Sequence, residues 1–178
     1  MAKPKITPTN REILLKKEDF IVSKTDLKSK ILYGNEIFIQ MSGYEEKEIL
    51  GKNHNILRHP DMPKCAFKLL YDYIQNQNKE WFGFVKNLRK DGGYYWVFAN
   101  ISPTLSPQGT KVGYYSVRRK PIDGFKNIIE PLYKHLKSIE DTKGMDAALE
   151  EVKKLLETKG MNFNELMIKI QKGLIDEL

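Results

Sequence analysis

Three strand-like segments separated by tight turns most constrain the fold of this chain. The segments are Trp81–Lys90, Tyr94–Thr104 and Lys111–Arg119, and they are rich in aromatic and β-branched residues. Asp91-Gly92-Gly93 makes the first connection and Ser106–Gly109 makes the second. Connections this short join antiparallel neighbours, because a parallel crossover needs a much longer segment. The pattern therefore predicts an antiparallel meander.

Shorter elements are expected before the meander. The expected strands are Asp19–Lys24 and Lys30–Tyr33, joined by a turn at Thr25–Ser29, and the expected helices are Glu36–Met41, Glu45–Leu50 and Lys64–Asn76. Asn10 is a candidate N-cap for a further short helix over Arg11–Lys17. Helices placed between two groups of strands must cover one face of the sheet. We expect an α+β fold in which a five-stranded antiparallel sheet carries helices on one face, with a pocket between the two layers.

The chain divides into three parts by composition. A loose lead at residues 1–18 precedes a mixed domain at residues 19–120, and a helical tail occupies residues 121–178. Apolar residues of the tail recur at spacings of three and four, as Val152 and Leu156 do, and form stripes that need a partner. The other tail helices, the sheet domain, a second copy of the chain and a different protein are all candidates for that partner.

Composition narrows the class of protein. No apolar run approaches the length needed to span a bilayer, and the first residues contain no apolar signal segment. A single cysteine, Cys65, excludes an internal disulfide. We therefore expect a cytoplasmic protein without direct membrane insertion.

Charge is shared unevenly along the chain. Residues 1–120 carry 21 basic and 12 acidic side chains, a net charge of +9, whereas residues 121–178 carry 9 and 11, a net charge of −2. A basic first part fits nucleic acid or an anionic small ligand equally well. The lysines are scattered over strands and loops without a recognition-helix pattern, and we expect no nucleic-acid partner.

The loop before the third expected helix is crowded with polar side chains, namely His54, Arg58, His59 and Asp61. An arginine can hold a phosphate or a carboxylate through two hydrogen bonds, and a histidine can donate or become charged beside it. Asp61 can orient one of these groups or neutralise it. A solvated, turn-rich connector is the plain alternative. The spacing matches no regular zinc pattern, so we expect no metal.

Alternation along the first strand of the meander places Trp81, Gly83, Val85 and Asn87 on one face. If that face looks inward, a flat ring, a bare backbone position and an amide share a wall suited to a planar heteroaromatic ligand. The alternative is that Trp81 belongs to the core and that Asn87 caps an edge. The sequence has no nucleophile elbow, phosphate-binding loop or dinucleotide fingerprint, and Cys65 is typical of a small core residue, so we expect no enzymatic activity.

Several motifs within about residues 10–135 recur together in one known family. They are Tyr33-Gly-Asn-Glu-Ile-Phe, Met41-Ser-Gly-Tyr, Glu48-Ile-Leu-Gly, His54-Asn-Ile-Leu-Arg-His-Pro-Asp-Met-Pro-Lys, Trp81-Phe-Gly-Phe-Val-Lys-Asn, Lys90-Asp-Gly, Tyr95-Trp-Val, Gly113-Tyr-Tyr-Ser-Val-Arg and Glu130-Pro-Leu-Tyr. With this order of elements, the chain resembles the flavin-binding PAS domain of bacterial aerotaxis (energy-taxis) receptors of the Aer type. The Arg-His-Pro-Asp-Met-Pro run is specific to that resemblance, whereas the Ser-Gly-Tyr and Lys-Asp-Gly pieces alone indicate only a PAS fold.

The resemblance implies non-covalently bound FAD whose redox state is the signal. The residues it implies in binding or retaining FAD are Asn35, Arg58, His59, Asp61, Trp81 and Asn87, with His54 and Phe67 as further candidates. A blue-light sensor of the light-oxygen-voltage (LOV) type is not expected, because its reactive cysteine follows a Gly-x-Asn motif and His54 stands there instead. A small flavoenzyme and a haem-binding PAS sensor are the alternatives.

The resemblance also implies a partner. Aer-type receptors continue into a membrane anchor, a HAMP segment and a kinase-control coiled coil, and the sequence shows none of these. It is similar in this respect to stand-alone PAS energy-taxis proteins of the CetB kind. We expect signalling to a membrane-bound, HAMP-containing chemotaxis receptor through the outer sheet surface or the tail, with a homodimer as an open alternative.

Overall fold

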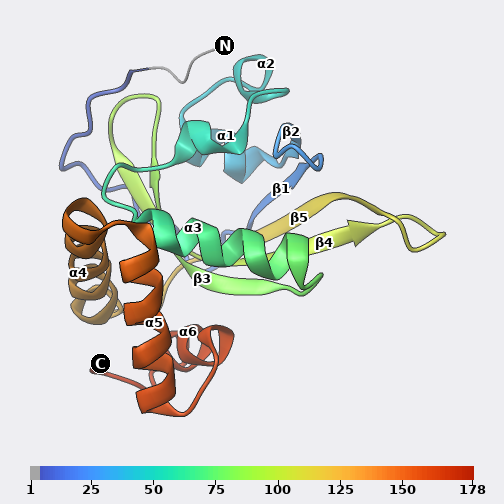
Figure 1. Cartoon of the computed structure of the whole chain (residues 1–178). Helices are drawn as coiled ribbons and strands as arrows, with labels where there is room; N and C mark the ends of the chain where they lie inside the picture. The colour runs from blue at the N-terminus through green and yellow to red at the C-terminus, as the bar shows by residue number, and fades with distance from the viewer. Residues whose placement is uncertain (1–4) are drawn as a thin grey trace.

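A five-stranded antiparallel sheet forms the centre of the molecule (Figure 1). The computed structural model describes residues 5–178. In chain order the strands are β1 (Ile21–Thr25), β2 (Ile31–Gly34), β3 (Trp81–Leu88), β4 (Tyr94–Leu105) and β5 (Lys111–Arg119). Their spatial order is β2-β1-β5-β4-β3, and every neighbouring pair is antiparallel. The predicted meander and five-stranded sheet are confirmed.

The segments between β2 and β3 cover one face of the sheet. They are α1 (Glu36–Ser42), α2 (Glu46–Ile49), the 3-10 helix η1 (His54–Leu57), α3 (Lys64–Tyr71) and a π-helical turn, η2 (Asp72–Asn76). Helix α3 lies alongside β3 and β4 in Figure 1. These helices follow the predicted positions closely, because the apolar spacing and the stop at Gly43, which adopts a left-handed φ of 72°, are local signals. The predicted α+β class is confirmed.

The prediction of a helix over Arg11–Lys17 was wrong. This segment is extended and runs beside the start of β4, where the amide of Ile13 donates to the carbonyl of Tyr94 and the amide of Tyr94 donates to the carbonyl of Arg11. Leu15 is buried there. Backbone groups paired with β4 are unavailable for helical hydrogen bonds, so tertiary pairing overrides the weak local propensity.

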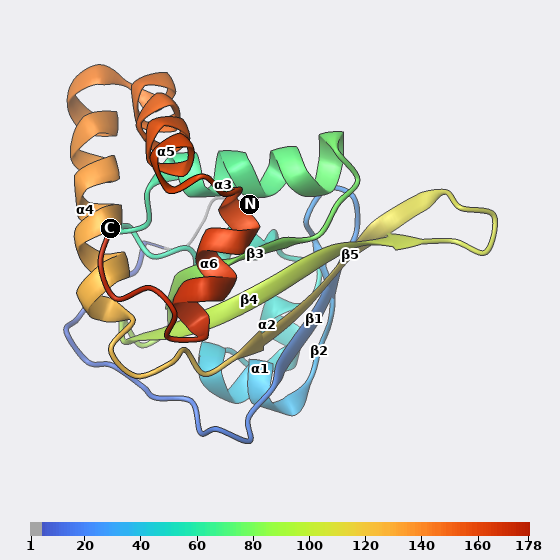
Figure 2. The ribbon, with the colours of Figure 1, turned by 90° about the horizontal axis from the view of Figure 1, so that it is seen from below.

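The tail consists of α4 (Lys126–Lys143), α5 (Met145–Lys159) and α6 (Phe163–Gln171). Helices α4 and α5 stand side by side near the β3 edge of the sheet, and α6 lies against β3 (Figure 2). The apolar stripes of the tail thus pack on one another and on the sheet domain. None of the helices in residues 5–178 combines the length and the apolar character needed to cross a membrane.

Successive side chains of β3 point to opposite faces of the sheet, and the two faces contact different parts of the molecule. The ring of Phe84 stacks on Phe125, just before α4, with centroids 5.2 Å apart and planes inclined by 8°. The hydroxyl of Tyr133 in α4 donates to the carbonyl of Phe84 at 2.8 Å. Val85 and Asn87, which alternate with these positions, face α3 and η1 on the other side. Around Val85 and Asn87 the inward face of β3 therefore meets the helices of the mixed domain, and at Phe84 the outward face meets the tail.

Candidate functional site

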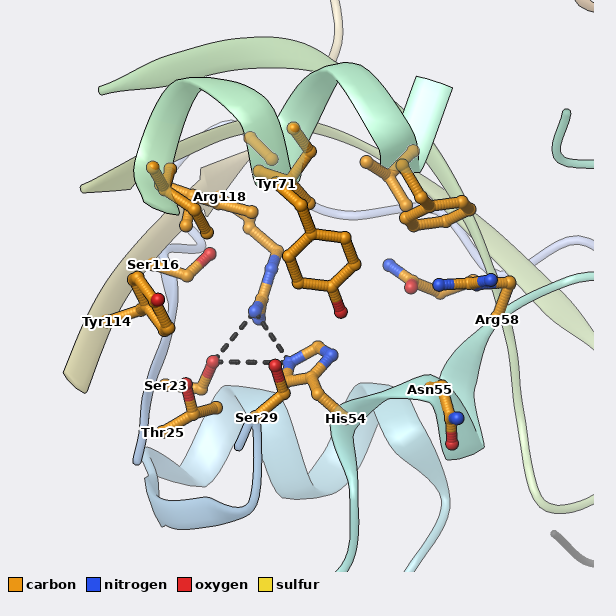
Figure 3. Close-up of a pocket in the computed structure, with 17 residues that line it drawn as sticks. Ser23, Thr25, Ser29, His54, Asn55, Arg58, Tyr71, Tyr114, Ser116 and Arg118 are labelled. Atoms are coloured by element: carbon orange, nitrogen blue, oxygen red, sulfur yellow. Dashed lines mark hydrogen bonds between the residues drawn. The ribbon is translucent and has the colours of Figure 1, made fainter. Parts of the chain in front are cut away.

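A cavity of about 90 Å³ lies between the inward face of the sheet and the layer made by η1 and α3. Its apolar walls come mainly from β3, β4 and α3, and consist of Phe67, Leu70, Ile74, Val85, Ala99 and Ile101. Its polar lining consists of Ser23, Thr25, Ser29, His54, Asn55, Arg58, Tyr71, Asn87, Tyr114, Ser116 and Arg118. Figure 3 shows the side chains of Tyr71 and Arg118 pointing into the middle of this space.

Arg118 places a buried positive charge in the cavity. Only 4% of its surface is exposed, and the strand β5 that carries it sits centrally in the sheet. Its Nη2 donates to the hydroxyl of Ser23 at 2.7 Å and lies 2.8 Å from Nε2 of His54 (Figure 3). Burial lowers the pKa of the guanidinium to about 10, which leaves it protonated at neutral pH. The charge is held by hydrogen bonds to uncharged groups, and this makes the cavity electropositive.

His54 is neutral in this setting. Burial is the largest cause that lowers its pKa, and the charges of Arg118 and Arg58 lower it further, to about 3. Because Arg118 can only donate, Nε2 of the neutral ring accepts and the proton sits on Nδ1. The ring centroid of Phe38 lies 5.9 Å away and fixes the other side of the imidazole. His54 therefore orients Arg118 and is not a group that exchanges protons near neutral pH.

Arg58 and Asn87 form the opposite end of the cavity. Arg58 follows η1, and its guanidinium lies 3.7 Å from the ring centroid of Phe67 in α3, a cation–π contact. Its backbone pairs with that of Asn87 in an isolated antiparallel bridge. Asn87 is 5% exposed, so its amide is held in the wall of the cavity. An amide that both donates and accepts thus lies next to a cation at the end of an apolar slot.

Four of the eight predicted site residues line this cavity: His54, Arg58, Phe67 and Asn87. The structure places the other four elsewhere. Asn35 is the N-cap of α1, where its Oδ1 accepts from the amides of Phe38 and Val22, both at 3.0 Å, and its Nδ2 donates to the carbonyl of Phe20 at 2.7 Å. These contacts fix α1 on the start of β1.

His59 and Asp61 face away from the cavity. Nδ1 of His59 accepts from the amide of Asp61 at 3.2 Å, and the imidazole is 3% exposed against the edge of Tyr94. The carboxylate of Asp61 accepts from Nζ of Lys86 at 2.7 Å, beside a groove between the sheet and α4. Both residues shape the loop that presents Arg58.

Trp81 lies on the inward face of β3, but its ring does not line the cavity. The ring folds over Gly83, where a Cβ atom would come within 2.3 Å of it, and stacks on Phe163 of α6 with centroids 5.9 Å apart. It is 1% exposed. The structure therefore brings Trp81 together with the tail.

Most of the cavity residues were not foreseen from the sequence, among them Ser23, Tyr71, Ser116 and Arg118. A usable signal existed for two of them. Alternation along Lys111–Arg119 places Ser116 and Arg118 on the same face, and an arginine on the inward face of a central strand is rare enough to single out.

Metal and thiol chemistry find no support at this site. Among residues 5–178, no three side chains of histidine, cysteine, aspartate or glutamate gather where they could hold a metal ion. Cys65 is fully buried on α3 and does not line the cavity. Burial and the carboxylate of Glu140 raise the pKa of its thiol to about 12. The thiol therefore lies away from the cavity and is protonated at neutral pH.

Comparison with known proteins identifies the fold. Residues 31–118 match the family described as the PAS fold. The chain is 39% identical over 141 residues to the Aerotaxis receptor of Escherichia coli (strain K12), which covers 79% of this chain and 28% of the receptor. It is 32% identical over 98 residues to the Nitrogen fixation regulatory protein of Klebsiella oxytoca, which covers 55% of this chain and 20% of that protein.

A solved structure shows the same architecture. The LOV domain from the Erythrobacter litoralis EL346 blue-light activated histidine kinase superposes with a TM-score of 0.52 at 22% identity, covering 57% of this chain and 94% of that one. The chain spans little more than a quarter of the aerotaxis receptor and a fifth of the nitrogen fixation regulator. The sheet order, the helices over its inward face and the family match agree, and the sheet with these helices has a PAS fold.

Proposed function

We propose that the chain is a PAS sensor that holds FAD non-covalently in the cavity and reports the redox state of the flavin. The observation that carries this proposal is the buried guanidinium of Arg118, which is held by neutral partners at one end of an apolar slot. A buried cation without a carboxylate partner is costly. An electron-rich ring system whose carbonyl oxygens and nitrogens approach it would offset part of that cost.

The residues present fit a flavin ring. Val85, Ala99 and Ile101 supply a flat apolar wall, and the amide of Asn87 can donate and accept along a ring edge. The hydroxyl of Ser116 is buried and has no hydrogen-bond partner among residues 5–178, so the cavity also offers an unused polar group. The free space is smaller than the roughly 300–1,000 Å³ of most small-molecule sites. The side chain of Tyr71, which projects into the space, must rotate to admit three fused rings, while Arg118 stays on Ser23 and His54.

The bound flavin would supply electron transfer, and its reduced form carries added negative charge. The protein contributes positioning and electrostatics. Arg118 favours the more negative form because of its fixed charge, and His54 keeps that charge in place by accepting from it. Arg58, stacked on Phe67, stands at the other end of the slot where it can hold a phosphate or ribityl oxygen. Redox change thus alters the charge that these groups face.

Sensing accounts for the site better than the alternatives do. A haem sensor would need an axial imidazole, whereas Nε2 of His54 is engaged by Arg118 and the ring of His59 is buried in the loop. A flavoenzyme would need a second substrate and a placed acid or base, and His54, the histidine that lines the slot, stays neutral over the working range of pH. The relatives at 39% and 32% identity are named as a receptor and a regulatory protein.

The similarity to the Aerotaxis receptor supports a role in energy taxis. We propose that the chain works in the cytoplasm and signals to a membrane-bound, HAMP-containing chemotaxis receptor, as stand-alone proteins of the CetB kind do. The outward sheet surface and the tail are the contact regions that this proposal assigns, with a homodimer as the second possibility. Nucleic acid has no part in it.

The colour of the purified protein tests the proposal directly. We expect absorption at about 450 nm that is bleached by a reductant and restored by air, as for a flavin chromophore. Chromatography of the chromophore released by heat then separates FAD from FMN. Protein that is colourless as isolated and takes up no FAD on incubation would overturn the proposal, and released FMN would overturn the choice of FAD.

A further inference from the structure

Helix α3 lies between the cavity and the tail, and its two faces contact different parts of the molecule. Phe67, Leu70 and Tyr71 line the cavity. Cys65 and Ala66, on the opposite face of the helix, pack against α4, α5 and α6. This second interface leaves a residual void of only about 10 Å³. Any displacement of α3 by an occupant of the cavity is therefore transmitted to a close-packed interface, because such interfaces do not deform continuously.

The tail also supplies the N-terminal cap of α3. The residue before the helix, Pro63, makes no side-chain cap hydrogen bond. In its place, the carboxylate of Glu140 in α4 accepts from the amide of Lys64 at 2.9 Å and from the amide of Cys65 at 2.5 Å. These are two of the amides that a helix leaves unsatisfied at its first turn, and a negative charge is favoured at that end. One side chain thus ties α3 to a helix 75 residues further along the chain.

The other end of α3 is held by the sheet. The helix passes into the π-helical turn η2, and Nζ of Lys111 on β5 donates to the carbonyls of Ile74 and Gln75 at 3.0 and 2.9 Å. Ile74 itself lines the cavity. A π-helical turn relaxes regular helix geometry and is often found at functional sites. Helix α3 is anchored to β5 at its C-terminal end and to the tail at its N-terminal end, with the cavity under its middle.

We propose that α3 couples occupancy of the cavity to docking of the α4–α6 tail. The coupling passes through the two hydrogen bonds that the carboxylate of Glu140 accepts from the first turn of α3. Contact of an occupant with Phe67 and Tyr71 sets the position of the first turn of α3, and that position decides whether Glu140 reaches both amides. The identity of the occupant rests on the proposed flavin function, whereas the coupling does not. In this proposal an occupant favours the state in which Glu140 accepts from both amides. By linkage, a variant that weakens these hydrogen bonds also weakens binding in the cavity, although Glu140 does not line it, and the coupling sets the upper limit of that effect.

The first test compares Glu140→Gln with the wild type, both as the full chain. Asp141→Asn is the matched control, because Asp141 is the next residue of α4 and lines the groove that Lys137 also lines. Hydrogen exchange read by mass spectrometry should show faster exchange in the first turn of α3 and across α5 and α6 in Glu140→Gln, by about tenfold. Titration with FAD should show a dissociation constant raised by at most a similar factor. Asp141→Asn should change neither quantity. Faster tail exchange with an unchanged FAD dissociation constant would overturn the coupling.

The second test needs no cofactor and so separates this inference from the proposed function. Phe67→Ala alters the cavity side of α3, and Lys68→Ala alters an exposed position on the same helix. In cofactor-free protein, Phe67→Ala should speed exchange in α5 and α6, and Lys68→Ala should not. Far-ultraviolet circular dichroism confirms that both variants are folded, and Tyr71→Ala replaces Phe67→Ala if the latter is not. An unchanged tail would overturn the coupling even if the protein binds FAD, and a responsive tail would support it even if the protein binds none.

Discussion

Nη2 of Arg118 and Nε2 of His54 lie 2.8 Å apart across the floor of the cavity, although 64 residues separate them in the chain. The pair works only while His54 is neutral, because a protonated ring has no acceptor to offer and would place a second charge beside the guanidinium. Burial and the two nearby arginines keep the pKa of His54 at about 3, well below its ordinary value of 6.5.

This relationship predicts an acid-sensitive fold. Between pH 6.5 and 3 the unfolded chain binds a proton at His54 that the folded chain does not bind. The contribution of His54 to the free energy of unfolding is therefore fully present above pH 6.5 and is lost as the pH drops towards 3. The slope is at most about 1.4 kcal/mol per pH unit. Urea unfolding at pH 7.0, 6.0 and 5.0 should show this loss in the wild type and a smaller loss in His54→Gln, which keeps an acceptor for Arg118.

The comparison of His54→Gln with the wild type decides the acid prediction. If His54→Gln and the wild type lose stability in parallel between pH 7 and 5, His54 is not the titrating group.

Arg58→Ala should weaken FAD binding. The variant removes the cation–π contact with Phe67 and the positive charge at the end of the slot, and we expect the dissociation constant to rise by about tenfold or more. Arg58→Lys keeps the charge but loses the planar contact, so its dissociation constant for FAD should lie between those of the wild type and Arg58→Ala. Flavin fluorescence titration measures the effect. Arg119→Ala, on an exposed position of β5, is the control, and equal affinities for all four proteins would remove Arg58 from the site.

Asn35→Ala should cost stability and leave FAD affinity unchanged. The side chain caps α1 and ties it to the start of β1 through three hydrogen bonds, and loss of such a cap costs about 1–2 kcal/mol. Asn35→Asp keeps both acceptor contacts and loses only the donation to Phe20, so it should cost less. Urea unfolding gives the free energies, and titration of the folded variants gives the affinity. A variant that unfolds like the wild type but fails to retain FAD would place Asn35 in the flavin site.

The elements of the fold were predictable because their signals are local. The expected segment Lys111–Arg119 coincides with β5, since two tight turns and alternating side chains define it without reference to the rest of the chain. The segment Arg11–Lys17 shows the converse. Its helix propensity is weak, and the carbonyl and amide of Tyr94, more than 75 residues away, determine its conformation.

The site was harder to predict because alternation gives the face of the strand on which a side chain lies, but not how deeply the side chain is buried or what it contacts. Alternation assigns Trp81 and Asn87 to the same face of β3, but it does not say that the ring of Trp81 folds over Gly83 towards a tail helix that arrives 82 residues later. Arg118 was hidden for another reason. It is one of 30 basic residues, and the alternation that places it on the same face as Ser116 becomes informative only once β5 is known to lie in the middle of the sheet. Both outcomes depend on long-range packing that no local pattern records.

Trp81 provides the sharpest remaining prediction, because its position in the fold and its role in the family resemblance differ. Trp81→Ala removes a fully buried ring and should destabilise the protein by about 3–5 kcal/mol, whereas Trp81→Phe keeps a ring to stack on Phe163 and should cost less. Combined with Phe163→Ala, a double-mutant cycle should give a coupling energy of about 0.5–1.5 kcal/mol between the two rings. FAD affinity of the folded Trp81→Phe protein should equal that of the wild type, since the ring does not line the cavity. If Trp81→Phe unfolds normally but loses FAD, the indole reaches the flavin, and its stacking on the tail is not its main role.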